Sequence, residues 1–147
     1  MNHTRDIVVD LDFEAAVGQL TRAIRDRGLT VISRLDVRDH FLKSLRQTFR
    51  RYVLVEAWSP ELAIEALQRD PGAGALLPTA FAVYELEAGK TAVVAAGRVE
   101  RAAADATHPQ QAETLAAIAE KEARLIDAVF DALRRPVQDC GVAHDAA

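Results

Sequence analysis

The stretch that most restricts how this chain can fold runs from Ala57 to Glu85 and contains two proline hinges. The first hinge, Ala57-Trp58-Ser59-Pro60, predicts a strand end followed at once by a helix, because Ser can cap a helix whose first position is Pro. Asp70-Pro71-Gly72 stops that helix, and Leu77-Pro78-Thr79 leads into the next strand. We therefore expect Trp58 and Thr79 to lie near one end of a sheet, where a site would form.

The remaining sequence predicts further strands and helices. Strands are expected over residues 7–11, 29–37, 52–57, 79–87 and 91–99, with a hairpin turn at 87–90 and the strand over 52–57 central in the sheet. A polar linker is expected over 102–107. The helices begin after Asp12, within 36–51, at Pro60 and at Pro109. Strands mixed with helices, together with a definite hairpin, indicate an α+β fold.

Apolar spacing gives each helix a face. Phe13, Val17, Leu20 and Ile24 form one stripe, and Gly28 supplies the left-handed position that ends this helix. In the second helix, Phe41, Leu45 and Phe49 would share a face. The long last helix carries apolar residues at positions 115, 118, 126, 129 and 133. This stripe would pack against the sheet, or part of it would pair with a second subunit.

Length and charge restrict the class of protein. The 147 residues predict a single domain over residues 1–135, with a flexible tail over 136–147. A net charge of −4 argues against bulk binding to nucleic acid or to an anionic membrane. The one cysteine, Cys140, excludes a disulfide within the chain. With no signal-peptide pattern and no apolar run long enough for a membrane span, we expect a cytoplasmic protein.

Several kinds of chemistry lack their motif. The four histidines are scattered and have no ligand-type neighbours at helical spacing, so we expect no metal site. Gly72-Ala73-Gly74 is too short for a phosphate-binding loop and lacks its Lys. Cys140 has no structured context for a nucleophile. We therefore predict no catalytic residues of these types and no cofactor.

Trp58 is the centre of the candidate site. It is the only tryptophan, and it could line an apolar ligand pocket with Ser59, Thr79, Glu56 and Tyr52. The alternative is an aromatic side chain that caps the core. Strand register places Glu56 on one face with Tyr52 and Trp58, so a desolvated Glu56 could act as a general base. The alternative is a carboxylate that faces solvent or pairs with an arginine.

The chain has one local basic cluster, which could hold a phosphate or an acidic partner. The alternative is a solvated helix face that balances the acidic remainder of the chain. The cluster consists of Lys43, Arg46, Arg50 and Arg51.

The run from Phe13 to Ala95 resembles the domain of unknown function 302 family. The elements that match are Arg27-Gly28-Leu29, Ala57-x-x-Pro60, Gly74-x-Leu76-Leu77-Pro78 and Val83-Tyr84-Glu85. The resemblance implies a curved, mostly antiparallel sheet packed by helices on one face, and it also suggests a homodimer. Members usually carry cysteines where this chain has Trp58 and Thr79, which implies that thiol or thiolate-metal chemistry is lost here.

These observations favour a small binding or interaction domain that forms a homodimer and holds a small apolar ligand near Trp58. The main alternative is an enzyme that uses Glu56 as a general base beside Thr79 or Tyr52. A third is a binder of acidic partners that uses the basic cluster.

Overall fold

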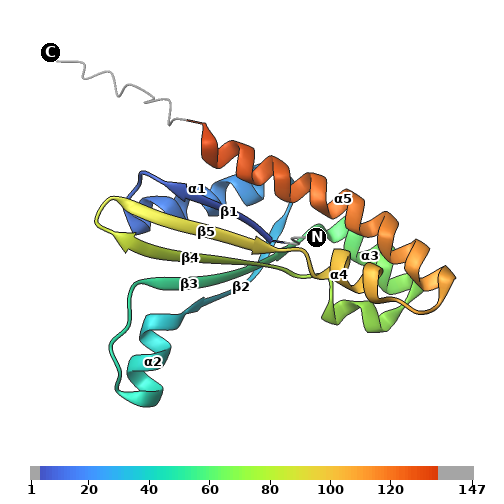
Figure 1. The fold of residues 1–147 in the computed structure, drawn as a ribbon, viewed down its shortest axis with the longest axis horizontal. Helices are drawn as coiled ribbons and strands as arrows, with labels where there is room; N and C mark the ends of the chain where they lie inside the picture. Colours follow the sequence, from blue (N-terminus) through green and yellow to red (C-terminus); the bar gives the residue numbers. More distant parts are fainter. Residues whose placement is uncertain (1–3, 136–147) are drawn as a thin grey trace, which may run out of the picture.

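A computed structural model describes residues 4–135, which form one five-stranded sheet and its helices (Figure 1). The strands are β1 (Thr4–Val9), β2 (Thr30–Asp36), β3 (Tyr52–Trp58), β4 (Thr79–Glu87) and β5 (Lys90–Ala96). The helices are α1 (Phe13–Asp26), α2 (Val37–Leu45), α3 (Pro60–Arg69), the short 3₁₀ helix η1 (Pro71–Ala75), α4 (Arg98–Asp105) and α5 (Pro109–Arg134). Cys140 and the predicted tail lie outside the described residues.

The sheet is antiparallel throughout, with strand order β1-β5-β4-β3-β2. This confirms the predicted α+β fold. The β4–β5 hairpin turns where the sequence predicts, with Gly89 at a φ of 77°. β3 lies inside the sheet between β2 and β4, as its apolar composition indicates, although β4 occupies the middle position.

Helices α1 and α5 cover one face of the sheet and form the main core with it (Figure 1). Alternate residues of β3 and β4 point into this core, including Val53, Val55 and Phe81. The predicted stripe on α1 is buried, although the side chain of Asp12 at the N-cap makes no capping hydrogen bond. Phe81 lies 6.4 Å from Phe130 of α5, measured between ring centroids. Truncating either ring would cost about 3–5 kcal/mol.

A second apolar cluster lies beyond one end of the sheet. It joins α3, η1 and α4 to the first half of α5, and it includes Ala66, Leu77, Val99 and Ile118. Helix α4 occupies much of the segment that the sequence predicted as strand end and linker, so that prediction was wrong. The helix has only a run of three alanines in place of larger apolar residues, so the sequence lacks a clear amphipathic signal: Val99 alone in α4 is fully buried, and alanines make the remaining contacts.

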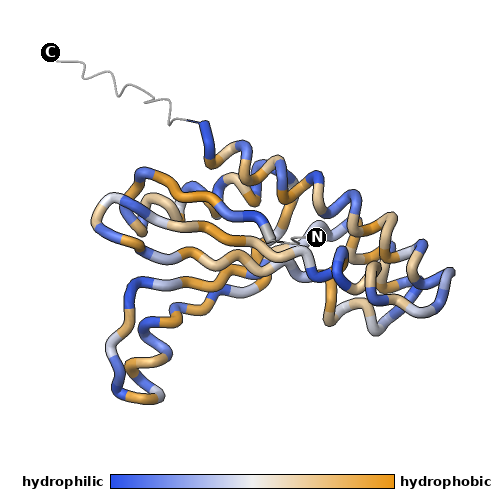
Figure 2. Tube along the Cα trace, in the orientation of Figure 1, coloured by the Kyte–Doolittle hydropathy of each residue, from blue (hydrophilic) through white to orange (hydrophobic). Residues whose placement is uncertain are grey.

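Helix α2 projects from the side of the sheet opposite to α1 and α5 (Figure 1). It ends at Leu45, and the following residue, Arg46, adopts a left-handed φ of 53°, so Phe49 lies beyond the helix and does not continue its face. The ring of Phe49 still contacts Phe41, at 5.3 Å between centroids. Apolar and polar residues alternate along α2 (Figure 2), and Leu42 and Leu45 are exposed.

Among residues 4–135, no helix layer covers the sheet face on the α2 side. We call it the open face and define it by one residue or more from each strand: Val8, Leu35, Leu54, Ala82, Tyr84 and Val94. Val8 and Leu35 are 54% and 45% exposed, which is high for apolar side chains in a sheet. Within residues 4–135, no helix is long and apolar enough to cross a membrane.

Candidate functional site

The end of the sheet near α3 holds a small cavity. Both hinges reach it, because Trp58 ends β3, Ser59 caps α3, and Thr79 begins β4 beside Ala57. The cavity measures about 10 Å³, which is room for about one water molecule. Its lining is mostly apolar and consists of Leu29, Trp58, Ser59, Leu62, Ala63, Leu77, Thr79, Ile118, Glu122 and Leu125.

The hinge at Ser59 forms as the sequence predicts. The Ser59 hydroxyl oxygen accepts a hydrogen bond from the backbone N–H of Leu62 at 3.3 Å, and Pro60 takes the first helical position. The same hydroxyl donates to Glu61 at 3.1 Å. This cap fixes the start of α3, and with it the wall of the cavity that α3 supplies.

Glu122 is the most unusual residue in the cavity wall. It lies on the buried side of α5, in the same row as Ile118 and Ile126, and is only 7% exposed. Its Oε1 accepts a hydrogen bond from the Thr79 hydroxyl at 2.5 Å. Its Oε2 is buried and receives no hydrogen bond from the residues that the structure describes. Glutamates are almost never this buried without a partner for the charge.

Burial sets the protonation of this carboxyl. Loss of hydration, the largest influence, raises the pKa of Glu122 from its ordinary 4.5 to about 7. The negative charge of Glu100 acts in the same direction, whereas the Thr79 hydrogen bond and the positive charges of Arg5 and Arg98 oppose it. Near neutral pH, Glu122 therefore exchanges readily between its neutral and charged forms.

Sequence reasoning missed Glu122. The signal was present, because residues 118, 122 and 126 are spaced four apart and a glutamate interrupts two isoleucines on an apolar stripe. Such a position is normally apolar, so a lone carboxylate there indicates a buried acid.

Glu56 lies on the other face of the sheet. It shares that face with Tyr52, as predicted, while Thr79 points into the helix-covered side. Arg98 pairs with Glu56 at 3.1 Å, and the Ser33 hydroxyl donates to its second oxygen at 3.1 Å. This is the ion-paired alternative that the sequence left open for Glu56.

Tyr52 also lies away from the cavity. Its ring stacks on Tyr84 at 5.3 Å between centroids, and Phe49 extends this contact toward α2. Of the five residues predicted to form one pocket, the structure brings together Trp58, Ser59 and Thr79, whereas Glu56 and Tyr52 do not line it.

The basic cluster is spread over α2 and the segment after it. Lys43 pairs with Asp39 at 2.8 Å, and Arg50 donates to the carbonyl oxygen of Glu85 at 3.5 Å. Arg51 lines a separate hollow, and Arg46 is exposed at the end of α2. An acidic partner for this surface stays a prediction from the sequence.

An apolar groove lies on the other side of Trp58. It measures about 340 Å³ and is lined by Trp58, Pro60, Ala63, Ile64, Leu67 and Gln68. Ile64 is 59% exposed there. Trp58 and Ala63 line both the groove and the cavity, so the indole lies between the two.

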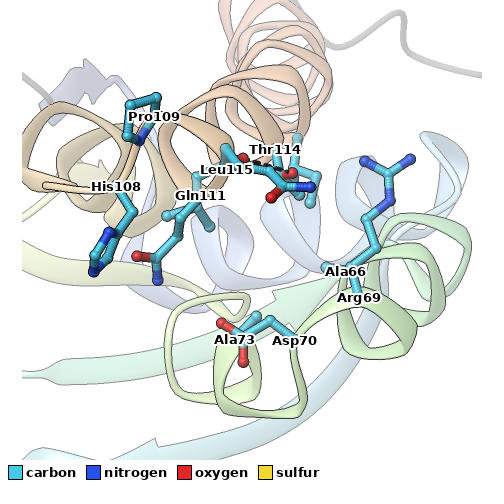
Figure 3. A pocket seen from close by; sticks show the side chains of 11 residues that line it. Ala66, Arg69, Asp70, Ala73, His108, Pro109, Gln111, Thr114 and Leu115 are labelled. Atoms are coloured by element: carbon cyan, nitrogen blue, oxygen red, sulfur yellow. Dashed lines mark hydrogen bonds between the residues drawn. The ribbon is translucent and has the colours of Figure 1, made fainter.

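A larger cleft of about 940 Å³ lies between α3, η1 and the first turns of α5 (Figure 3). His108 and Gln111 extend toward η1, where Asp70 lies, and Arg69 extends from α3. These side chains are exposed, and two of them have local partners: Arg69 pairs with Glu65, and Asp70 accepts from the N–H of Gly72. Among residues 4–135, no group of three or more His, Cys, Asp or Glu side chains could hold a metal ion.

Fold and site together define a small α+β domain with helices on one sheet face and a buried carboxylate at the sheet end. The family model for the domain of unknown function DUF302 matches residues 6–133, and the chain belongs to this family. A similar solved structure is that of an uncharacterized conserved DUF302 protein from Bacillus stearothermophilus, with 19% identity and a TM-score of 0.70. The match covers 88% of this chain and 99% of that one. No curated protein matches the chain.

Proposed function

We propose that this chain is a binding domain that holds a small apolar ligand against Trp58. The observation that carries the proposal is the position of the indole, half-buried between the groove and the cavity. Trp58 also packs against the second apolar cluster. Here one side is an open apolar groove, and apolar grooves with an aromatic wall are typical ligand sites.

An enzyme that uses Glu56 has less support. The carboxylate pairs with Arg98 and lies on the face opposite to Thr79. A base in that position would not act beside the Thr79 hydroxyl, whereas Tyr52, the other proposed partner, shares its face but stacks on Tyr84. We therefore place the ligand, and not a reaction, at this end of the sheet. A cytoplasmic location stays the expectation from the sequence.

Fluorescence of Trp58, the only tryptophan, tests the proposal directly. Titration with 1-hexanol should shift the emission and reach saturation. Ile64→Lys should weaken binding at least several-fold, because it places a charge in the groove. Leu86→Lys is the matched control, since Leu86 is also exposed but lies on β4 outside the groove. An emission that does not change with 1-hexanol, or equal weakening by both variants, would overturn the proposal.

We also propose that two copies associate through the open face and α2. The specific support is that one side of the molecule exposes both an apolar sheet face and a helix with exposed Leu42 and Leu45. A twofold dimer needs a surface that is complementary to itself. Here α2 of each copy would pack on the open face of the other, because the helix and the uncovered sheet lie on the same side of one chain. The oligomeric state in solution tests this proposal.

A further inference from the structure

The second oxygen of Glu122 needs a partner that the described residues do not supply. Oε2 is buried and receives no hydrogen bond, while Thr79 satisfies Oε1. A buried acceptor without a donor is costly, so native proteins rarely leave one. Glu122 lines the cavity beside Trp58, and the cavity has room for one small group.

When Glu122 is ionised, the missing partner of Oε2 is a hydrogen-bond donor. Thr79 already donates to the carboxyl group, and the rest of the cavity wall is mostly apolar. A carboxylate or phosphate head group would be repelled by an ionised Glu122. An ammonium group donates up to three hydrogen bonds, matches the charge of the carboxylate, and is attracted by the face of an indole.

The groove gives such a head group a place for its apolar chain. Because Trp58 and Ala63 line both spaces, the groove and the cavity adjoin at the indole, and a chain would join them by displacing this half-buried ring. We propose that the site binds a small amphiphile whose primary ammonium head pairs with Glu122 while its alkyl chain lies in the groove along α3. This inference rests on the proposed function and deepens it, since it names the class of ligand.

Charged groups around Glu122 influence the pairing. Glu100 and Arg98 of α4 and Arg5 of β1 act on the carboxyl from two elements, and Arg5 is itself paired with Glu100 and Asp127. The ammonium needs the ionised carboxylate. Affinity for an amine should therefore rise as the pH passes upward through about 7, where Glu122 loses its proton.

The test compares three six-carbon probes on the full chain at pH 8 by calorimetry and Trp58 emission: hexylamine, 1-hexanol and hexanoate. Hexylamine should bind at least about tenfold more tightly than 1-hexanol, because a hydrogen bond to a charged group is worth that much or more. Hexanoate should bind most weakly. Glu122→Gln should reduce hexylamine to the affinity of 1-hexanol, while Glu120→Gln, an exposed neighbour on α5, should change nothing.

Each outcome decides a different point. Equal binding of hexylamine and 1-hexanol, or no effect of Glu122→Gln, would overturn the ammonium site, with a water molecule as the partner of Oε2, and leave the apolar groove standing. Failure of all three probes to bind would overturn the proposed function as well. If Glu122→Gln did not fold, the comparison of amine with alcohol at pH 5.5 and pH 8 on the unaltered chain would still decide, since only the ammonium site predicts a preference that grows with pH.

Discussion

At the scale of single residues, the buried carboxyl of Glu122 sets the most specific expectation. The folded protein holds this proton up to about pH 7, whereas the unfolded chain releases it near 4.5. Between these values the folded state binds more protons, so rising pH lowers the free energy of unfolding and the loss is complete above about 7. The difference corresponds to roughly 3 kcal/mol.

We expect Glu122→Gln to remove this dependence. With glutamine at position 122, the contribution of this residue to the free energy of unfolding should not change between pH 4.5 and pH 7. At pH 8 the variant should be more stable than the unaltered chain by up to about 3 kcal/mol. Urea unfolding at pH 4.5, 6 and 8 measures the effect, with Glu120→Gln as the control. If the free energies of unfolding of the variant and the unaltered chain differed by the same amount at all three pH values, the titration of a buried Glu122 would be contradicted.

Single residues also show what the sequence could not predict. Alternation correctly placed Glu56, Tyr52 and Trp58 on one face of β3, but it could not say which face the helices cover. The pairing of Ala57 with Thr79 puts the Thr79 side chain on the covered side, away from Glu56. Trp58 escapes this rule because it ends the strand, where its ring can turn toward α3 and the cavity.

At the scale of elements, strong local signals made prediction reliable. The Ser59-Pro60 cap, Gly28, the hairpin at Gly89 and the stripe on α5 all give the element that the sequence indicates. Helix α4 lacked such a signal because its buried surface is supplied mainly by alanines. The sequence predicts Phe49 on the helix face, because no local residue pattern indicates that Arg46 adopts a left-handed backbone conformation.

The cap of α3 can be tested alone. Ser59→Ala removes the acceptor for the Leu62 N–H and should cost about 1 kcal/mol of stability. Ser44→Ala, on the exposed side of α2, should change stability by less than about 0.5 kcal/mol. Chemical unfolding of both variants at one pH measures the difference. Equal small effects would show that Pro60 alone fixes the start of α3.

At the scale of the whole molecule, α5 connects the two apolar clusters. Ile118 belongs to the cluster at the sheet end and Ile126 to the main core, with Glu122 between them. The candidate ligand site thus lies at the boundary of the two clusters. A ligand that binds only the folded protein would stabilise the whole domain from this point.

The proposed dimer is a prediction at this scale. Sedimentation equilibrium at high micromolar concentration should give twice the 16.0 kDa of the chain. The double variant Leu35→Lys/Leu45→Lys should give the single mass, because it places charge on the open face and on α2. Ile64→Lys should remain dimeric although it loses the ligand. A monomeric unaltered chain would exclude the open face as a stable interface.

The strand β2 has a consequence for solubility. It lies at one edge of the sheet, and within residues 4–135 no further strand pairs with its outer backbone groups. An edge of this kind can recruit strands from other chains and start aggregation. Two features oppose this: the pairing with β3 slips by one residue between Val31 and Ser33, and the strand exposes the charges of Arg34 and Asp36. A bulged, charged edge resists edge-to-edge growth, so β2 disfavours open-ended assembly of the sheet.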